Sequence, residues 1–162
     1  MTTPAGELPP LRSPQSTRNR AHVFARASLV LVGLSPWLLP LVCASVPLGA
    51  VGDWLGLPFA LVCHRRPERT LLLLGVAMPV CSRCAGIFAG AAVGALFAWP
   101  RVELRRGRIA LGVAVFLTAL DVLLQDAGVH PVWHSSRLAT GALLGYVAAL
   151  TLTSLLAREA GA

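Results

Sequence analysis

Four long runs of apolar residues constrain the fold of this chain more than any other feature of its sequence. The runs cover residues 27–48, 79–99, 109–126 and 136–156, and each approaches the roughly 20 residues that a helix needs to cross about 30 Å of hydrocarbon. Apolar residues make up 56% of the 162-residue chain and charged residues only 13%, a balance that a water-soluble domain of this size could not bury. The sequence therefore predicts an all-α protein, a four-span transmembrane helix bundle embedded in the lipid bilayer.

The residues before the first apolar run have a different composition. Residues 1–20 are rich in Pro, Ser, Thr and Arg and show no apolar periodicity, so we expect a disordered N-terminal tail followed by a single transmembrane domain over residues 21–160. The apolar run behind the tail is too long for the core of a signal peptide, which spans about 7–15 residues. Pro36, Pro40 and Pro47 lie within this run and are expected to kink the first span.

The basic residues, all of them arginines, indicate how the bundle is oriented. With four crossings, one side of the membrane receives Arg12, Arg18, Arg20, Arg26, Arg101, Arg105, Arg106, Arg108 and Arg158. The other side receives Arg65, Arg66, Arg69, Arg83 and Arg137. The positive-inside rule then predicts a multi-pass cell-membrane protein with both termini in the cytoplasm and the segment between the first two spans facing outside. The arginines flank apolar runs and accompany no nucleic-acid-binding module, so we expect no nucleic-acid partner.

An irregular segment between the first two spans carries three of the four cysteines. Cys63 and His64 are adjacent, and Cys81 and Cys84 form a C-x-x-C pair. Three thiols and one imidazole are the ligand set of a Cys₃His zinc site, and C-x-x-C is a standard half-site. Adjacent Cys and His side chains diverge on a regular helix or strand, so the predicted site requires an irregular turn, which Pro67 makes plausible. The sequence predicts a metal site, with zinc as the expected ion, near the outer membrane interface.

The same thiols allow other interpretations. Cys81 and Cys84 lie at the expected start of the second span, where the helix dipole and Arg83 would lower thiol pKa values, so a membrane thiol–disulfide oxidoreductase is an alternative. A structural interpretation makes the cysteines buried small side chains or one structural disulfide. A third functional hypothesis is a non-enzymatic transporter, partner subunit or structural protein. No residue is assigned a catalytic role, and the sequence leaves open whether the protein is an enzyme.

Polar residues in the later spans fall at the same predicted end of the bundle as the cysteines. Asp121 and Gln125 are four residues apart and share a helix face, and a charge near the bilayer centre costs at least ~2.5 kcal/mol. A simple structural interpretation pairs Asp121 with Arg137, which opens the fourth span. The functional interpretation is a supporting polar site around the cysteines that comprises Arg69, Arg83, Asp121, Gln125 and Arg137.

Glycines recur at four-residue spacing in two of the spans. Gly86, Gly90 and Gly94 form one ladder, and Gly141 and Gly145 form another. Small residues at this spacing let a neighbouring helix approach closely. The ladders therefore suggest a homo-oligomer or a membrane partner.

The polar motifs together resemble the signature of a family of small prokaryotic integral membrane proteins of unknown function. The matching elements are Cys63-His64, Pro67-Glu68-Arg69, the run PVCSRCAG at residues 79–86, Asp121 with Gln125, and Arg137 with Thr140-Gly141. The chain departs from the family pattern at Arg65, Thr70 and Val122, where Gln, Ser and Gly are expected. The resemblance covers about residues 60 to 145 and implies family membership, but no reaction.

Overall fold

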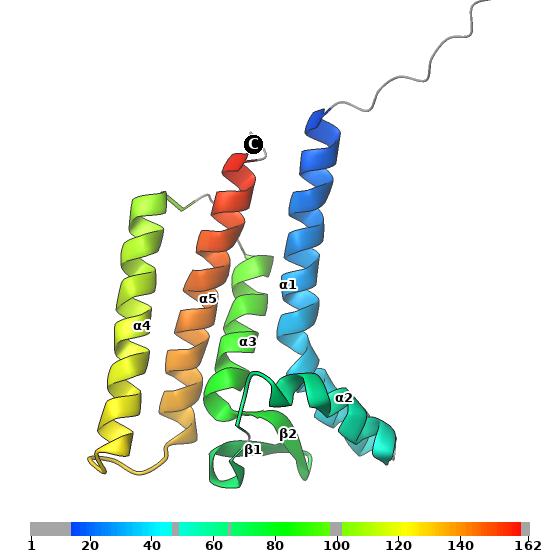
Figure 1. The fold of residues 1–162 in the computed structure, drawn as a ribbon, viewed down its shortest axis with the longest axis vertical. Helices are drawn as coiled ribbons and strands as arrows, with labels where there is room; N and C mark the ends of the chain where they lie inside the picture. Colours follow the sequence, from blue (N-terminus) through cyan, green and yellow to red (C-terminus); the bar gives the residue numbers. More distant parts are fainter. Residues whose placement is uncertain (1–13, 47–48, 65, 98–101, 160–162) are drawn as a thin grey trace, which may run out of the picture.

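The computed structural model describes residues 14–46, 49–64, 66–97 and 102–159 of the chain, and these are mostly helical (Figure 1). In chain order the elements are α1 (Pro14–Ser45), α2 (Ala50–Ala60), the 3₁₀ helix η1 (Pro67–Arg69), β1 (Thr70–Leu73), β2 (Val76–Cys81), α3 (Ser82–Leu96), α4 (Leu104–Asp126) and α5 (His134–Glu159). The helical prediction is confirmed. The antiparallel hairpin β1–β2 was not predicted from the sequence.

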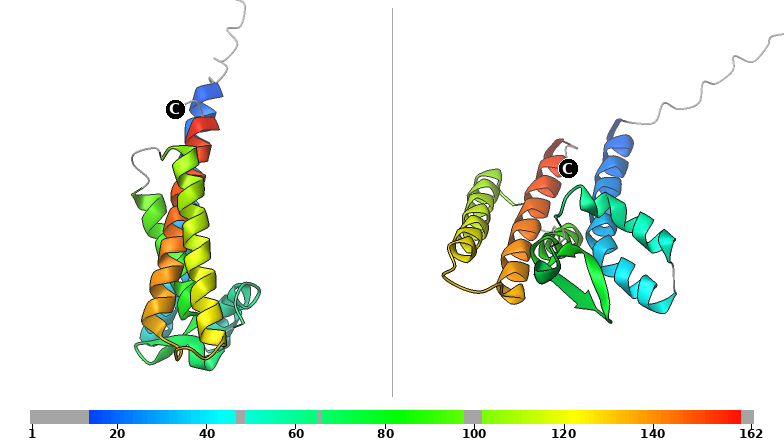
Figure 2. Two further views of the ribbon diagram at one scale, coloured as in Figure 1. Left: turned by 90° about the vertical axis from the view of Figure 1, so that its left-hand side faces the viewer. Right: turned by 60° about the horizontal axis from the view of Figure 1, so that its bottom comes forward.

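The four longest helices stand in a row in the order α4, α5, α3, α1 (Figure 1), and the row is thin when it is turned by 90° (Figure 2). Taken in chain order, the four long helices α1, α3, α4 and α5 alternate in direction, so the start of α1 and the end of α5 lie at one end of the bundle. The hairpin, α2 and the connection between α4 and α5 lie at the other end, which we call the hairpin end (Figure 1).

The prediction of four complete spans was wrong. Among the described residues, three helices are long and apolar enough to cross a membrane: Arg20–Ser45, Leu104–Asp126 and His134–Arg158. The second predicted span contains only the 15 residues of α3, which at 1.5 Å per residue reach about 22 Å. Residues 79–81 belong to β2 instead, whose last residue, Cys81, pairs with Thr70 of β1; residues 98–101 lie outside the described part of the chain.

The hairpin owes its tight turn to two residues with positive φ. Leu73 pairs with Val76, which leaves a two-residue loop of Leu74 (φ 52°) and Gly75 (φ 80°). Positive φ at both central positions is the feature of a type I′ turn, whose right-handed twist matches that of the strands. Leucine is a poor residue for this position, since its Cβ crowds the backbone. Because Leu74-Gly75 replaces the usual Asn-Gly pair of a type I′ turn, the sequence does not announce this hairpin.

The first helix begins earlier than expected and continues through two prolines. It starts at Pro14, inside the segment 1–20 that we expected to be disordered; residues 1–13, as well as 47 and 48 at the end of the predicted first span, lie outside the described residues. Pro36 cannot donate to the carbonyl of Val32, four residues before it. The hydroxyl of Ser35 donates to that carbonyl instead, at 2.7 Å, so the helix continues to Ser45.

The two glycine ladders face each other within the chain. A Cβ added to Gly90 of α3 would lie 2.0 Å from the carbonyl oxygen of Ala142 in α5, and one added to Gly145 would lie 2.0 Å from that of Ile87. The other ladder glycines, Gly86, Gly94 and Gly141, bring the same two helices together at 2.3, 2.6 and 2.2 Å for an added Cβ. Both ladders thus join α3 to α5 within the chain, and the homo-oligomer or membrane partner that the sequence suggested stays a prediction.

The opposite side of α3 is fixed by side chains of α1. Arg26 donates from Nε to the carbonyl of Ala95 (3.0 Å) and from Nη2 to that of Leu96 (2.9 Å). A guanidinium at the carbonyl end of a helix satisfies free acceptors and complements the helix dipole. Near the other end of α3, Trp37 Nε1 donates to the carbonyl of Ala85 at 3.1 Å. The position of α3 is therefore set by α5 on one side and α1 on the other.

Candidate metal centre

Three sulfur atoms converge at the hairpin end of the bundle. The Sγ atoms of Cys63, Cys81 and Cys84 all lie within 4.8 Å of one another, and each of these cysteines is free. Thiolates bound tetrahedrally at about 2.3 Å from one zinc ion lie about 3.8 Å apart. The observed spacing is therefore close to that of a shared ion, and it brings together three of the four ligands predicted from the sequence.

The hairpin is the element that assembles this cluster. Cys63 ends the turn that follows α2, where its N–H donates to the carbonyl of Phe59 at 3.0 Å. The chain then enters β1, reverses at the type I′ turn and returns along β2, whose last residue, Cys81, pairs with Thr70 at the start of β1. The backbone N–H of Cys81 donates to Cys63 Sγ at 3.2 Å. Cys84 follows in the first turn of α3.

His64 lies outside the sulfur cluster. Cys63 is buried, at 7% exposure, whereas the next side chain is exposed, and the group of potential ligands contains no histidine. Consecutive side chains point in different directions, and here the turn directs the thiol inward and the imidazole outward. The structure thus provides a Cys₃ cluster in place of the predicted Cys₃His set.

The predicted supporting residues lie between α3, α4 and α5, but with different partners from those expected. Arg83 Nη2 donates to Asp121 Oδ2, and both side chains are largely buried. The simple interpretation that paired Asp121 with Arg137 is therefore wrong. Because the carboxylate and the guanidinium of Arg83 neutralise each other, this pair adds no net charge to the hairpin end.

Arg137 is a buried cation whose side-chain partner is neutral. It is 3% exposed, and its Nη1 donates to Oε1 of Gln125. Within the described part of the chain, none of the salt bridges includes Arg137. A buried charge is costly unless it is paired, and Arg137 is among the groups that lower the pKa of the Cys81 thiol.

Hydrogen bonds to Cys81 hold its pKa well below the ordinary range of a thiol. The largest contribution comes from the side chain of Cys84, and burial opposes it; hydrogen bonds from the backbone N–H of Cys84, from Cys63 and from Arg137 act in the lowering direction. A thiolate is the form that binds metals and attacks electrophiles. Cys81 is therefore the thiol of the cluster that ionises first.

Two more residues belong near the cluster: Arg69, which was predicted from the sequence, and Ser82, which was not. Arg69 forms a salt bridge with Asp126 (3.5 Å) that ties η1 to the end of α4, with both side chains partly exposed. Ser82, which lies between Cys81 and Cys84 in the sequence, is fully buried, and its hydroxyl has no hydrogen-bond partner among the described residues. Its only sequence signal was its place between two cysteines. Arg65 lies outside the described residues.

The arrangement of these residues can now be compared with known proteins. A family model described as "Predicted membrane protein (DUF2085)" matches residues 63–151, so the matched region begins at Cys63 and includes the whole sulfur cluster and its polar surroundings. No solved structure matches the chain.

Two archaeal relatives were found by sequence comparison. An uncharacterized protein of Methanocaldococcus jannaschii is 31% identical over 93 residues, which cover 54% of this chain and 59% of the relative. An uncharacterized protein of Methanothermobacter thermautotrophicus is 35% identical over 85 residues, which cover 51% of this chain and 77% of the relative. The similarity therefore includes little more than half of the chain and only part of each relative.

Proposed function

Because the chain belongs to the family of predicted membrane proteins DUF2085, we propose that it is a membrane protein that binds a divalent metal ion, with zinc as the preferred ion. The proposed ligands are Cys63, Cys81 and Cys84. The observation that carries the proposal is the mutual approach of their sulfur atoms, all within 4.8 Å of one another. Thiolates are soft ligands that select zinc and other thiophilic metals over magnesium or calcium.

The charges around the cluster support a divalent ion. Three thiolates and one divalent cation carry a net charge of −1, and Arg137, which helps to lower the pKa of Cys81, is the cation that we propose to balance it. Arg83 and Asp121 already neutralise each other. A monovalent ion would leave an additional buried negative charge, which is costly in a region of low dielectric. The electrostatic balance therefore favours zinc over a monovalent ion such as Cu(I).

The proposed site has an open fourth position. His64 is exposed and outside the ligand group, while Cys81 and Cys84 are only half-buried, so a water molecule or a substrate can reach the metal. Zinc with three protein ligands and one exchangeable position is the arrangement found in catalytic sites, whereas structural sites use four protein ligands. His64→Ala separates the two cases, because it lowers metal affinity only if the imidazole is the fourth ligand.

We also propose that the cluster faces the outside of the cell and that both termini are cytoplasmic. The start of α1 and the end of α5 share one end of the bundle, opposite the hairpin (Figure 1). Among the described residues, more arginines lie in the segments at that end than at the hairpin end, and the positive-inside rule assigns such an end to the cytoplasm. The arginines of the terminal end are Arg18, Arg20, Arg26, Arg105, Arg106, Arg108 and Arg158.

Metal analysis of the purified protein tests the proposal. We expect about one zinc ion per chain, and less than about 0.2 per chain after Cys81→Ser, since one thiolate of a three-thiolate site is lost. Cys43→Ser is the matched control, because Cys43 lies on α1 outside the cluster, and it should keep its zinc. Substitution with cobalt should give thiolate-to-metal charge-transfer absorption that disappears with Cys81→Ser. Wild-type protein that is purified without metal and does not bind added zinc or cobalt would contradict the proposal.

A thiol–disulfide oxidoreductase is a second candidate, favoured by the lowered pKa of Cys81 and by the proximity of a second thiol. In this reaction Cys81 and Cys84 lose two protons and two electrons to an acceptor disulfide and form a disulfide themselves. Alkylation with mass-shifting reagents in living cells detects this couple as a reversible change in the number of free thiols. Thiols that stay reduced and metal-bound under all conditions would exclude it.

A further inference from the structure

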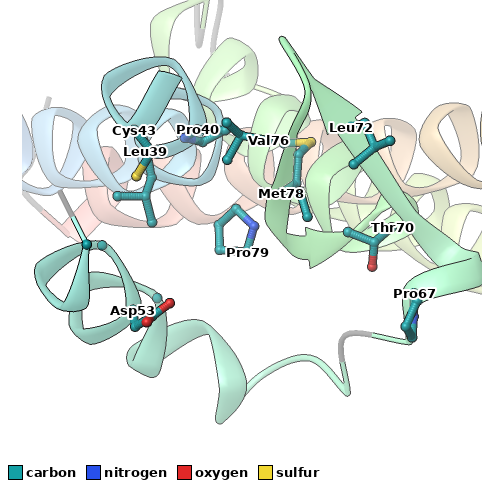
Figure 3. A pocket seen from close by; sticks show the side chains of 14 residues that line it. Leu39, Pro40, Cys43, Asp53, Pro67, Thr70, Leu72, Val76, Met78 and Pro79 are labelled. Atoms are coloured by element: carbon teal, nitrogen blue, oxygen red, sulfur yellow. The ribbon is translucent and has the colours of Figure 1, made fainter. Parts of the chain in front are cut away.

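A cavity of about 850 Å³ lies between α1, α2 and the hairpin (Figure 3). This volume is within the range of about 300–1,000 Å³ that is typical of small-molecule sites. None of the three cysteines of the candidate metal centre lines the cavity. Whatever this cavity binds is therefore a question separate from the proposed metal site.

The helix α2 presents its small and polar residues to the cavity and its large apolar residues to the outside. Gly52, Asp53 and Gly56 line the cavity, whereas Trp54 (74% exposed) and Leu57 (52% exposed) do not. A helix on a water-soluble protein would have the opposite orientation. The outer face of α2 is thus suited to lipid, and the helix separates the cavity from the surrounding bilayer.

The walls of the cavity have the character of a site for an amphiphile. The sides formed by α1 and β2 are apolar and include Leu39, Pro40, Met78 and Pro79. Asp53 is the charged side chain among the lining residues, and it takes part in none of the salt bridges of the described residues. Its carboxylate is exposed and therefore accessible to a ligand, so the walls favour an apolar chain and the carboxylate favours a cationic head group by charge complementarity.

We propose that the cavity binds an amine-headed lipid from the bilayer, with the ammonium group at Asp53 and the hydrocarbon chain along the accessible lining residues Leu39, Leu72 and Val76. The glycines of α2 leave a bare backbone surface at the same wall, which lets a head group approach closely. This binding site goes beyond the proposed metal function and does not depend on it.

Protection of Cys43 against alkylation tests the proposal on the full-length protein in detergent. Cys43 lines the cavity, and the probe is hexadecylamine, with hexadecanol as an uncharged ligand of equal chain length. At saturating probe the alkylation rate of Cys43, located by peptide mass spectrometry, should fall at least about fivefold, as expected for roughly 80% occupancy of one site. Val42→Cys provides a neighbouring thiol on α1 that is outside the lining and should not be protected.

The variant Asp53→Asn identifies the contribution of the charge. It should remove the preference for hexadecylamine over hexadecanol while the elution profile in size exclusion stays that of the wild type. Equal protection of Cys43 by the amine and the alcohol in the wild type would mean an apolar chain site without head-group selection, which overturns the proposal. Equal protection at positions 42 and 43, or no protection by either probe, would overturn it as well.

Discussion

Replacing Gly90 by alanine tests the packing that positions the candidate metal centre. A Cβ at this position would lie 2.0 Å from the carbonyl oxygen of Ala142 and 2.9 Å from its Cα. These are backbone atoms of α5, so no side-chain rotation can relieve the clash. To reach even 3.0 Å from the oxygen, the two helices must separate locally by at least 1.0 Å.

The structure allows the cost of this separation to be estimated. A radial gap of about 0.5–1 Å forfeits a quarter to a half of each van der Waals contact along the interface, and overpacking of this kind costs about 1–3 kcal/mol. The better helix propensity of alanine returns up to about 1 kcal/mol. We expect a net loss of about 2 kcal/mol, which lowers Tm by about 4–8 °C in a protein of this size.

Thermal unfolding in detergent, followed by tryptophan fluorescence, measures the loss directly. The matched control is Gly112→Ala, because a Cβ on Gly112 in the middle of α4 meets no atom within 4 Å. This control gains helix propensity without a clash and should raise Tm by about 2–4 °C. If Gly90→Ala is as stable as Gly112→Ala, the close contact between α3 and α5 does not exist. The packing that positions the candidate metal centre would then be refuted.

Three further predictions concern the electrostatics of the bundle. Arg137→Gln should weaken zinc binding about 10- to 100-fold, the usual effect of removing a group that supports metal ligands, and Arg137→Lys should restore part of the affinity. Competition with a chromophoric chelator measures both zinc affinities. An unchanged affinity in Arg137→Gln would contradict the proposed charge balance. Arg26→Met should cost about 1–2 kcal/mol in thermal unfolding, because the carbonyl end of α3 loses its cationic cap, and a Tm equal to that of the wild type would refute this role. In metal-free protein the lowered pKa of Cys81 keeps this thiol ionised at pH 6, so iodoacetamide should modify it at that pH. Free cysteine, with a pKa of about 8.5, reacts slowly there. If the alkylation rate of Cys81 falls in parallel with that of free cysteine between pH 8 and 6, the pKa of Cys81 is not lowered.

The membrane helices were predictable because hydropathy is a local property. The long apolar runs that became α1, α4 and α5 needed no knowledge of their neighbours. The hairpin was missed for the opposite reason. Its strands depend on pairing between residues 70–73 and 76–81, and its Leu74-Gly75 turn lacks the residues that usually announce a type I′ turn.

The candidate site was predicted in part. From the C-x-x-C motif and the expected topology we predicted that Cys81 and Cys84 lie close to Cys63, and the three sulfur atoms do approach one another in the structure. The sequence could not show that the exposed His64 side chain lies outside the sulfur cluster, since neighbouring residues do not fix the direction of a side chain within an irregular turn; its role as a ligand stays a prediction. The partner of Asp121 was assigned wrongly because the choice between Arg83 and Arg137 depends on the relative heights of three helices, which the glycine contacts between α3 and α5 determine.

The short third helix has a consequence for the membrane around the protein. Its length of about 22 Å is about 8 Å less than the thickness of a typical hydrocarbon core, about 30 Å, while α1, α4 and α5 are long enough to cross it. We therefore expect the leaflet to dip toward Leu96 beside the carbonyl end of α3, where the guanidinium of Arg26 would meet the lipid phosphate groups. The protein should thin the bilayer locally on its terminal side, and thinner lipids should relieve the mismatch and stabilise it.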